Sequence, residues 1–257
     1  MLLIQYALKC QVKELLLSVA TEEDDDNDVE YDPLVLDVPL ISQHLKILHL
    51  KRVDLKRSTL NFSRCSVLEE LEMQDCYIDA RRISSKSLKR LCITDFCSFP
   101  TKFHIRIFAP GLISLQLDNF DGLTPSLEYM PSLETAYVWL DHDCYHSCRI
   151  NRQDCEYDHC SCHAYPVEEG VLLHGLSNAV NLELLGNTYT ELKFVGATGA
   201  QEKIEQSFVC SHLEVVNIEC GKVDEGVHKI LKFLSTCGIR RDQISIVEQW
   251  PSYRFSF

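Results

Sequence analysis

The sequence predicts an α/β solenoid, in which short parallel strands form a curved sheet, helical or irregular segments cover its outer side, and a strand-helix-strand unit closes the C-terminal end. Three observations predict this fold. An apolar phrase, L-x-x-L-x-L, recurs along the chain, its copies keep a near-constant spacing, and the apolar residues near the C-terminal end change to helical spacing. Hydrophobic residues make up 46% of the 257 residues and charged residues 25%, which is the usual composition of a folded protein with a sizeable core.

Five copies of the phrase define the central part of the chain. Their middle positions are Leu48, Leu71, Leu91, Leu115 and, in a weaker copy, Ala136, so that successive copies lie 23, 20, 24 and 21 residues apart. Alternating apolar residues point to one face of a short strand, and stacking such strands in parallel buries these faces in one continuous core. The spacing falls within the roughly 20–29 residues of leucine-rich repeats. We therefore predict a leucine-rich-repeat array.

Three fainter copies extend the array toward both ends, with middle positions Leu15, Leu182 and Val216. Their spacing is irregular because long segments separate them from their neighbours. The first of these segments holds an acidic run at residues 22–30. Such a block repels itself, so we interpret it as a solvated loop inserted into a repeat. The alternative is a docking tail for a basic partner.

Another apolar or cysteine position follows most of the central copies after two or three residues. These positions are Val53 and Leu55, Cys76 and Ile78, Phe96, and Phe120. They match the x-x-N/C-x-L continuation of the repeat. We expect Cys76, and Cys220 after the last copy, to be packing residues, because cysteine is among the most often buried residue types.

The C-terminal end reads as a strand-helix-strand unit over residues 213–247. Apolar residues recur at helical spacing within residues 223–237, and they are Val227, Ile230, Leu231 and Leu234. Asp224 is a suitable N-cap for this helix and Gly238 a suitable C-terminal stop. The alternating Ile244 and Ile246 predict a final strand.

A cluster of cysteines and histidines occupies the insertion at residues 141–166. Zinc prefers four tetrahedral sulfur or nitrogen ligands, commonly from two closely spaced pairs. Cys144 and Cys148 could supply one pair, and Cys160 with Cys162 or His163 the other. The spacing is looser than in paired C-x2-C motifs, so the alternative is a polar insertion that carries free thiols.

The net charge excludes several classes of partner. The chain has 38 acidic and 25 basic residues, which gives a formal charge of −13, and this argues against binding to nucleic acid or to an anionic membrane surface. No apolar stretch approaches the roughly 18 residues of a membrane helix. We find no secretory signal pattern, so the 13 cysteines favour a reducing compartment, cytoplasmic and/or nuclear.

The predicted sheet offers a binding surface instead of a catalytic centre. Phosphate-binding glycine loops, a G-x-S-x-G elbow and an H-E-x-x-H motif do not occur, so we predict that the chain is not an enzyme. The residues between the leucines point to the concave side, which is the usual partner-binding surface of a solenoid. They are His49, Lys51, Glu70, Glu72, Gln74, Arg90, Cys92, Thr94, Ser114, Gln116, Asp118, Tyr137 and Trp139. Tyrosine and tryptophan are frequent anchors of interfaces.

Several segments resemble the plant F-box/leucine-rich-repeat proteins, in particular the grass subgroup, and their C-terminal FBD-like region. The similar segments are LKILHLKRVDL (45–55), LEELEMQDCYI (68–78), LKRLCI (88–93), FAPGLISLQLDNF (108–120), MPSLETAYV (130–138), LLHGLSNAVNLELL (172–185) and CSHLEVVNIECGKVDEGVHKILKFLSTCGI (210–239). In that family an F-box module docks on a Skp-type adaptor of a cullin ubiquitin ligase. The repeats of these proteins present a target protein for ubiquitin transfer.

The resemblance implies a domain organisation and a function. It implies a repeat array over residues 1–190 with an acidic loop at 21–32, an irregular linker at 191–207, an FBD-like unit at 208–247 and a tail at 248–257. We see no F-box, so we expect a truncated or splice form that recognises a target protein without binding the adaptor. The alternatives are a zinc-stabilised structural or regulatory module and a non-functional gene fragment.

Overall fold

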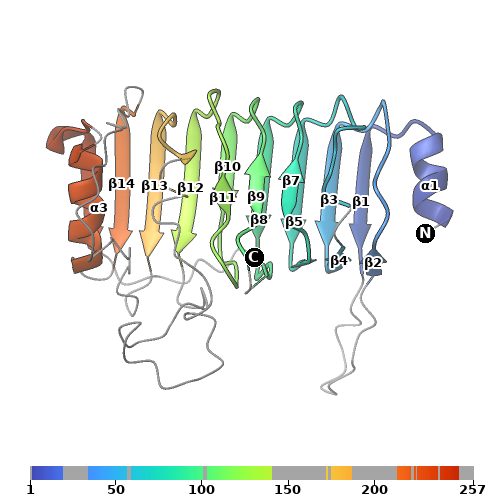
Figure 1. The fold of residues 1–257 in the computed structure, drawn as a ribbon, viewed down its shortest axis with the longest axis horizontal. Coiled ribbons are helices and arrows are strands. Elements are labelled where there is room, and N and C mark those ends of the chain that lie inside the picture. The colour runs from blue at the N-terminus through green and yellow to red at the C-terminus, as the bar shows by residue number, and fades with distance from the viewer. Residues whose placement is uncertain are drawn as a thin grey trace, which may run out of the picture.

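The computed structural model describes residues 2–19, 34–56, 59–100, 103–140, 172, 175–186, 213–220, 223, 225–236 and 238–248. These residues form an elongated α/β array in which parallel strands lie side by side and a helix lies at each end (Figure 1). Helix α1 (Leu2–Lys9) lies at the N-terminal end and helix α3 (Glu225–Thr236) at the C-terminal end. The arrangement is solenoid-like, as the sequence predicts.

The main sheet has nine strands in the order β1-β3-β5-β8-β10-β12-β13-β14-β15, and every neighbouring pair is parallel. The strands are β1 (Glu14–Ser18), β3 (Ile47–Lys51), β5 (Glu70–Gln74), β8 (Arg90–Thr94), β10 (Ser114–Leu117), β12 (Thr135–Leu140), β13 (Asn181–Gly186), β14 (Val215–Cys220) and β15 (Ile244–Glu248). The sheet therefore grows in chain order, one strand per repeat.

The register of the sheet confirms the position of every predicted copy of the phrase. The middle residues pair across the whole sheet in one row, which runs Leu15, Leu48, Leu71, Leu91, Leu115, Ala136, Leu182, Val216 and Ile244. The interior members of this row are buried, whereas Leu15 and Ile244 at the two edges are only partly buried. The leucine phrase thus determines where each strand lies and in which register it pairs with its neighbours.

Short strands, in place of the expected helical or irregular segments, cover much of the outer side. One three-stranded parallel sheet contains β2 (Leu34–Leu36), β4 (Val53–Leu55) and β6 (Tyr77–Ile78). A second contains β7 (Arg82–Ser84), β9 (Arg106–Phe108) and β11 (Ser126–Leu127). The return segments of neighbouring repeats are extended and pair with one another, which satisfies their backbone groups.

The core lies between these layers. Ile83, Ile107 and Leu127 of the second small sheet belong to the same buried cluster as the leucines of the main sheet. Figure 1 shows β7, β9 and β11 overlapping the middle of the main sheet. The residues on the other side of the main sheet therefore face away from the core, and we call this side the non-core face.

A left-handed residue follows several main strands and turns the chain away from the sheet. Arg52, Asp75 and Asn119 have φ values of 56°, 50° and 49°. After β8 two successive residues are left-handed, Asp95 and Phe96, with φ values of 55° and 63°.

The additional residue after β8 makes one prediction wrong. Phe96 was expected at an inward packing position, but its side chain is 69% exposed, and Cys97 is buried in its place. Val53, Cys76 and Phe120 are buried as predicted. The extra residue therefore shifts the inward position by one in this repeat.

The predicted C-terminal unit is confirmed as β14, α3 and β15, with β15 parallel to β14. The helix ends at the predicted stop, where Gly238 has a φ of 87°. The Gly238 amide donates to the Ser235 carbonyl at 3.1 Å and the Ile239 amide to the Leu234 carbonyl at 3.0 Å, which is the hydrogen-bond pattern of a Schellman motif. The predicted N-cap, Asp224, lies outside the described residues.

Candidate partner-binding face

The non-core face presents three rows of side chains that run across the main sheet. The central row is continuous through all nine strands, and it contains Leu16, His49, Glu72, Cys92, Gln116, Tyr137, Glu183, Asn217 and Ser245. Alternation along each strand sets the two flanking rows. This geometry follows directly from the register of the leucines on the opposite side.

The structure places all the sequence-predicted face residues on or beside these rows. His49, Glu72, Cys92, Gln116 and Tyr137 lie in the central row. One flanking row contains Glu70, Arg90 and Ser114. The other contains Lys51, Gln74, Thr94 and Trp139, together with Asp118, which directly follows β10. Thr94 is the weakest of these predictions, because its side chain is only 7% exposed and offers little surface to a partner.

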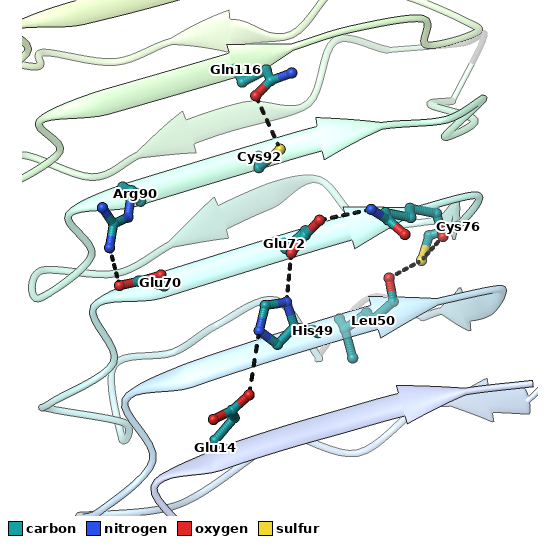
Figure 2. A network of polar contacts seen from close by, with 10 residues as sticks. Glu14, His49, Leu50, Glu70, Glu72, Cys76, Arg90, Cys92 and Gln116 are labelled. Atoms are coloured by element: carbon teal, nitrogen blue, oxygen red, sulfur yellow. Dashed lines mark hydrogen bonds and ion pairs between the residues drawn. The ribbon is translucent and has the colours of Figure 1, made fainter. Parts of the chain in front are cut away.

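Glu72 lies at the centre of a polar network on the N-terminal half of the face. One oxygen of Glu72 lies 2.6 Å from His49 Nδ1, and the Gln74 amide donates to the other at 2.7 Å. His49 Nε2 lies 3.9 Å from a carboxylate oxygen of Glu14 (Figure 2). Each side chain here comes from β1, β3 or β5, so the network links three successive repeats.

Arg90 and Glu70 form an ion pair between β8 and β5 on the same half of the face (Figure 2). The side-chain hydrogen bond to Glu70 raises the pKa of Arg90. This pair balances the charge of Glu70, and the Glu72 carboxylate has polar partners in His49 and Gln74.

A hollow of about 340 Å³ opens on this half of the face. Its lining consists of Glu14, Leu16, His49, Leu50, Lys51, Glu72 and Gln74. Glu14 and Leu16 were not among the predicted face residues, although the faint copy of the phrase around Leu15 carried the signal. Alternation on either side of Leu15 puts both neighbours on the non-core face.

Cys92 and Asp118 lie near the middle of the face in a partly buried environment. Burial raises the pKa of the Cys92 thiol to about 11, and the nearby carboxylates of Glu72 and Asp118 add to this. Burial also raises the pKa of Asp118, with a further contribution from Asp95. The Cys92 thiol lies 3.5 Å from the Gln116 side-chain oxygen and donates to it (Figure 2). A protonated thiol is a poor nucleophile.

The C-terminal half of the face has a different composition. Tyr137 pairs in register with Glu183, and Trp139 pairs with Leu185. Glu219 lies on the next strand beside Leu185. Glu183, Leu185 and Glu219 were missing from the prediction, although the fainter copies at Leu182 and Val216 placed them by the same alternation.

Most of the other cysteines in the described part of the chain are packing residues, and Cys10 is the exposed exception. Cys76, Cys97 and Cys220 are buried. The Cys76 thiol lies 3.4 Å from the Leu50 carbonyl oxygen (Figure 2) and the Cys97 thiol lies 3.4 Å from the Met73 carbonyl oxygen, and each donates to that oxygen. Cys76 and Cys97, each just after a main strand, thus donate to a carbonyl group of the preceding repeat. The burial of Cys76 and Cys220 confirms the prediction that they are packing residues.

The zinc hypothesis concerns residues that the structure does not describe. Cys144, Cys148, Cys160 and Cys162 all fall within the undescribed residues 141–171, and the acidic loop at 21–32 and the linker at 191–207 are likewise outside the described residues. Within the described ranges, no group of three or more histidine, cysteine, aspartate or glutamate side chains is arranged to hold a metal ion.

Comparison with the models of known protein families, with curated proteins and with solved structures finds no match. None of the helices in the described part of the chain has the length and apolar character needed to cross a membrane.

Proposed function

We propose that this chain is a protein-recognition array of the leucine-rich-repeat type, which binds a target protein through its non-core face. The observation that carries the proposal is the unbroken register of the main sheet. Nine parallel strands align the side chains that alternate with the buried ones into one continuous surface, and such surfaces of stacked repeats are widely used to bind partners.

The size of the face supports a protein partner. Eight spacings between nine strands, at about 4.8 Å each, give a length of about 38 Å. With strands of about five residues, the footprint is about 600 Å², which falls at the lower end of a stable protein–protein interface, roughly 600–1,000 Å² per partner. A small molecule would use only a fraction of this surface.

The chemistry of the face also favours recognition over catalysis. Cys92 is the thiol of the central row, and its pKa of about 11 keeps it protonated at neutral pH. Among the described residues, His49 has polar contacts with carboxylates and with no hydroxyl or thiol. The resemblance of residues 45–55, 68–78 and 210–239 to F-box/leucine-rich-repeat proteins supports the same class of function, the recognition of a target protein, here without adaptor binding.

A matched pair of tyrosine variants tests the proposal. Tyr137 lies in the central row of the non-core face, whereas Tyr129 follows β11 on the outer side and is 72% exposed. Partners would be captured with the intact chain, identified by quantitative mass spectrometry, purified and titrated against each variant by calorimetry. We expect Tyr137→Ala to weaken binding by about tenfold or more, as for a buried interface anchor, and Tyr129→Ala to bind as the wild type does.

Equal affinity of the two tyrosine variants for the purified partner would show that binding does not involve the non-core face. Circular dichroism of both variants checks that the fold is intact. A loss of affinity with Tyr129→Ala alone would place the interface on the outer side and would overturn the proposal.

A further inference from the structure

Charged residues are distributed unevenly over the non-core face. Lysine and arginine occur on this face at Lys51 and Arg90, both on the N-terminal half. On the strands from β10 to β15, the described residues of the face include three acids, Asp118, Glu183 and Glu219, and no lysine or arginine. The C-terminal half is therefore negatively charged.

The acids of the two halves also differ in what surrounds them. Glu70 is paired with Arg90, and Glu72 is in contact with His49 and Gln74. Within the described ranges, neither Glu183 nor Glu219 has an ion pair or a side-chain hydrogen bond.

Asp118 is the most constrained of the three acids on the C-terminal half. Its partial burial and the like charge of the nearby Asp95 raise its pKa, whereas a side-chain hydrogen bond with Gln116 lowers it. One of its carboxylate oxygens is buried without a hydrogen bond in the structure. A cation close to Asp118 would relieve both unfavourable effects.

Aromatic and aliphatic side chains lie between these acids. Tyr137 and Trp139 are two residues apart on β12, so their side chains project from the same face of the sheet. Glu183 is the in-register neighbour of Tyr137, and Leu185 is that of Trp139. Val215, at the edge of the same surface, is 42% exposed. The half from β10 to β15 thus combines an apolar surface with unbalanced negative charge.

We infer that the half of the non-core face from β10 to β15 binds a partner segment that carries arginine or lysine next to apolar side chains. This inference rests on the proposed recognition function and specifies the partner's chemistry. A guanidinium group stacks on an aromatic ring while it donates to a carboxylate. Tyr137 beside Glu183, and Trp139 beside the position of Asp118, provide two such combinations on neighbouring strands.

The span of the surface sets the length of the segment. Five strands, β10 and β12 to β15, cover four spacings of about 4.8 Å, or about 19 Å. An extended peptide of about seven residues reaches across this distance at about 3.3 Å per residue. The suitable probe is a fluorescein-labelled peptide of this length in which three arginines alternate with leucines.

Binding of the probe to the intact chain, followed by fluorescence anisotropy, tests the inference. Two comparison peptides replace arginine by citrulline, which keeps the shape and removes the charge, or by glutamate. We expect the arginine peptide to bind about tenfold or more tightly than the citrulline peptide, with affinity that falls as salt rises, because the added contacts are charge-assisted.

A matched pair of double variants locates the bound peptide. Asp118→Asn/Glu183→Gln removes two charges from the C-terminal half. The control, Glu69→Gln/Asp75→Asn, also removes two negative charges, but from exposed positions on either side of β5. There the two carboxylates form surface ion pairs with Lys46 and Arg52. We expect the first variant to weaken binding of the arginine peptide by about tenfold, and the second by less than about twofold.

Two results would overturn the inference. One is equal or absent binding of the arginine and citrulline peptides at millimolar concentration, and the other is equal affinity of the two double variants. If either occurs while Tyr137→Ala still weakens binding of the purified target, recognition by the non-core face stands and only the partner's chemistry is wrong. If Tyr137→Ala and Tyr129→Ala are indistinguishable, the recognition function itself fails.

Discussion

Gly122 and Gly238 share a left-handed backbone conformation but differ in the space around them. Their φ values are 90° and 87°. A Cβ atom at Gly122 would lie 2.2 Å from the Phe99 carbonyl oxygen, whereas a Cβ atom at Gly238 would meet no atom of the described residues within 4 Å. Gly122 is therefore required both for its left-handed conformation and for the lack of space around it, whereas Gly238 is required for its conformation alone.

Substitution by alanine separates these two reasons. We expect Gly238→Ala to lower the free energy of unfolding by about 1 kcal/mol, the cost of the left-handed conformation. Gly122→Ala should lower it by about 3 kcal/mol or more, because the backbone of Phe99 must also move. Urea denaturation followed by circular dichroism measures both. Equal losses would mean that the turn around Gly122 relaxes without cost.

The Cys92 thiol provides a test of the electrostatics of the non-core face. The pKa of this thiol is raised from 9.0 to about 11 in the folded chain. The neutral thiol therefore contributes its full stabilisation below about pH 9, and this contribution is lost as the pH rises through about 11. Glu72→Gln removes one of the charges that raise this pKa. We therefore expect iodoacetamide to modify Cys92 faster at pH 9 in this variant.

Peptide-resolved mass spectrometry measures the modification of Cys92. The exposed Cys10 serves as the internal reference for reagent and time. An unchanged ratio of the two rates in Glu72→Gln would contradict a Coulombic contribution from Glu72.

At the scale of the element, the leucine phrase determined which strands could be predicted. Alternating apolar residues fix both the strand and its inward face, so even the faint copies around Leu15, Leu182 and Val216 gave correct register. The turn after β8 was not predictable in this way. Its length depends on two successive left-handed residues, Asp95 and Phe96, and such conformations are uncommon for residues other than glycine.

The same principle explains which part of the candidate face could be found from sequence. The face residues from β3 to β12 were identified because they lie within or directly after the five central copies of the phrase. Glu14 and Leu16 at one end, and Glu183 and Glu219 at the other, follow from the faint copies by identical alternation. What sequence could not show is the pairing across strands, such as Glu72 with His49, because it depends on side-chain geometry between repeats.

Equivalent leucines in different strands should contribute unequally to stability. Leu91 and Leu15 occupy the same row of the sheet, but Leu91 is 1% exposed in the interior, whereas Leu15 on the edge strand is only partly buried. We expect Leu91→Ala to lower the free energy of unfolding by about 3 kcal/mol and Leu15→Ala by about 1 kcal/mol. Urea denaturation of both variants provides the comparison. Equal losses would indicate that the edge strand is covered as fully as the interior.

At the scale of the whole molecule, the fold is a stack in which each main strand pairs only with the strands beside it. The buried cluster nevertheless runs from Ile4 in α1 to Ile239, which follows α3. Stability in such a stack is approximately a sum of repeat and neighbour terms. A change in one repeat should therefore weaken the neighbouring repeats most, and its effect should decline with distance along the sheet.

Hydrogen exchange measures this decline directly. In the wild type we expect backbone amides of β1 and β15 to exchange faster than those of β5, β8 and β10, because the edge strands are less buried. Leu115→Ala, which opens a cavity beneath β10, should accelerate exchange in β8, β10 and β12 by about tenfold or more while leaving β1 nearly unchanged. Leu15→Ala is the control, since it should affect β1 and β3 alone. Uniform acceleration over all nine strands would instead show that the sheet opens as one cooperative unit, and that the coupling between repeats is stronger than the energy of any single repeat.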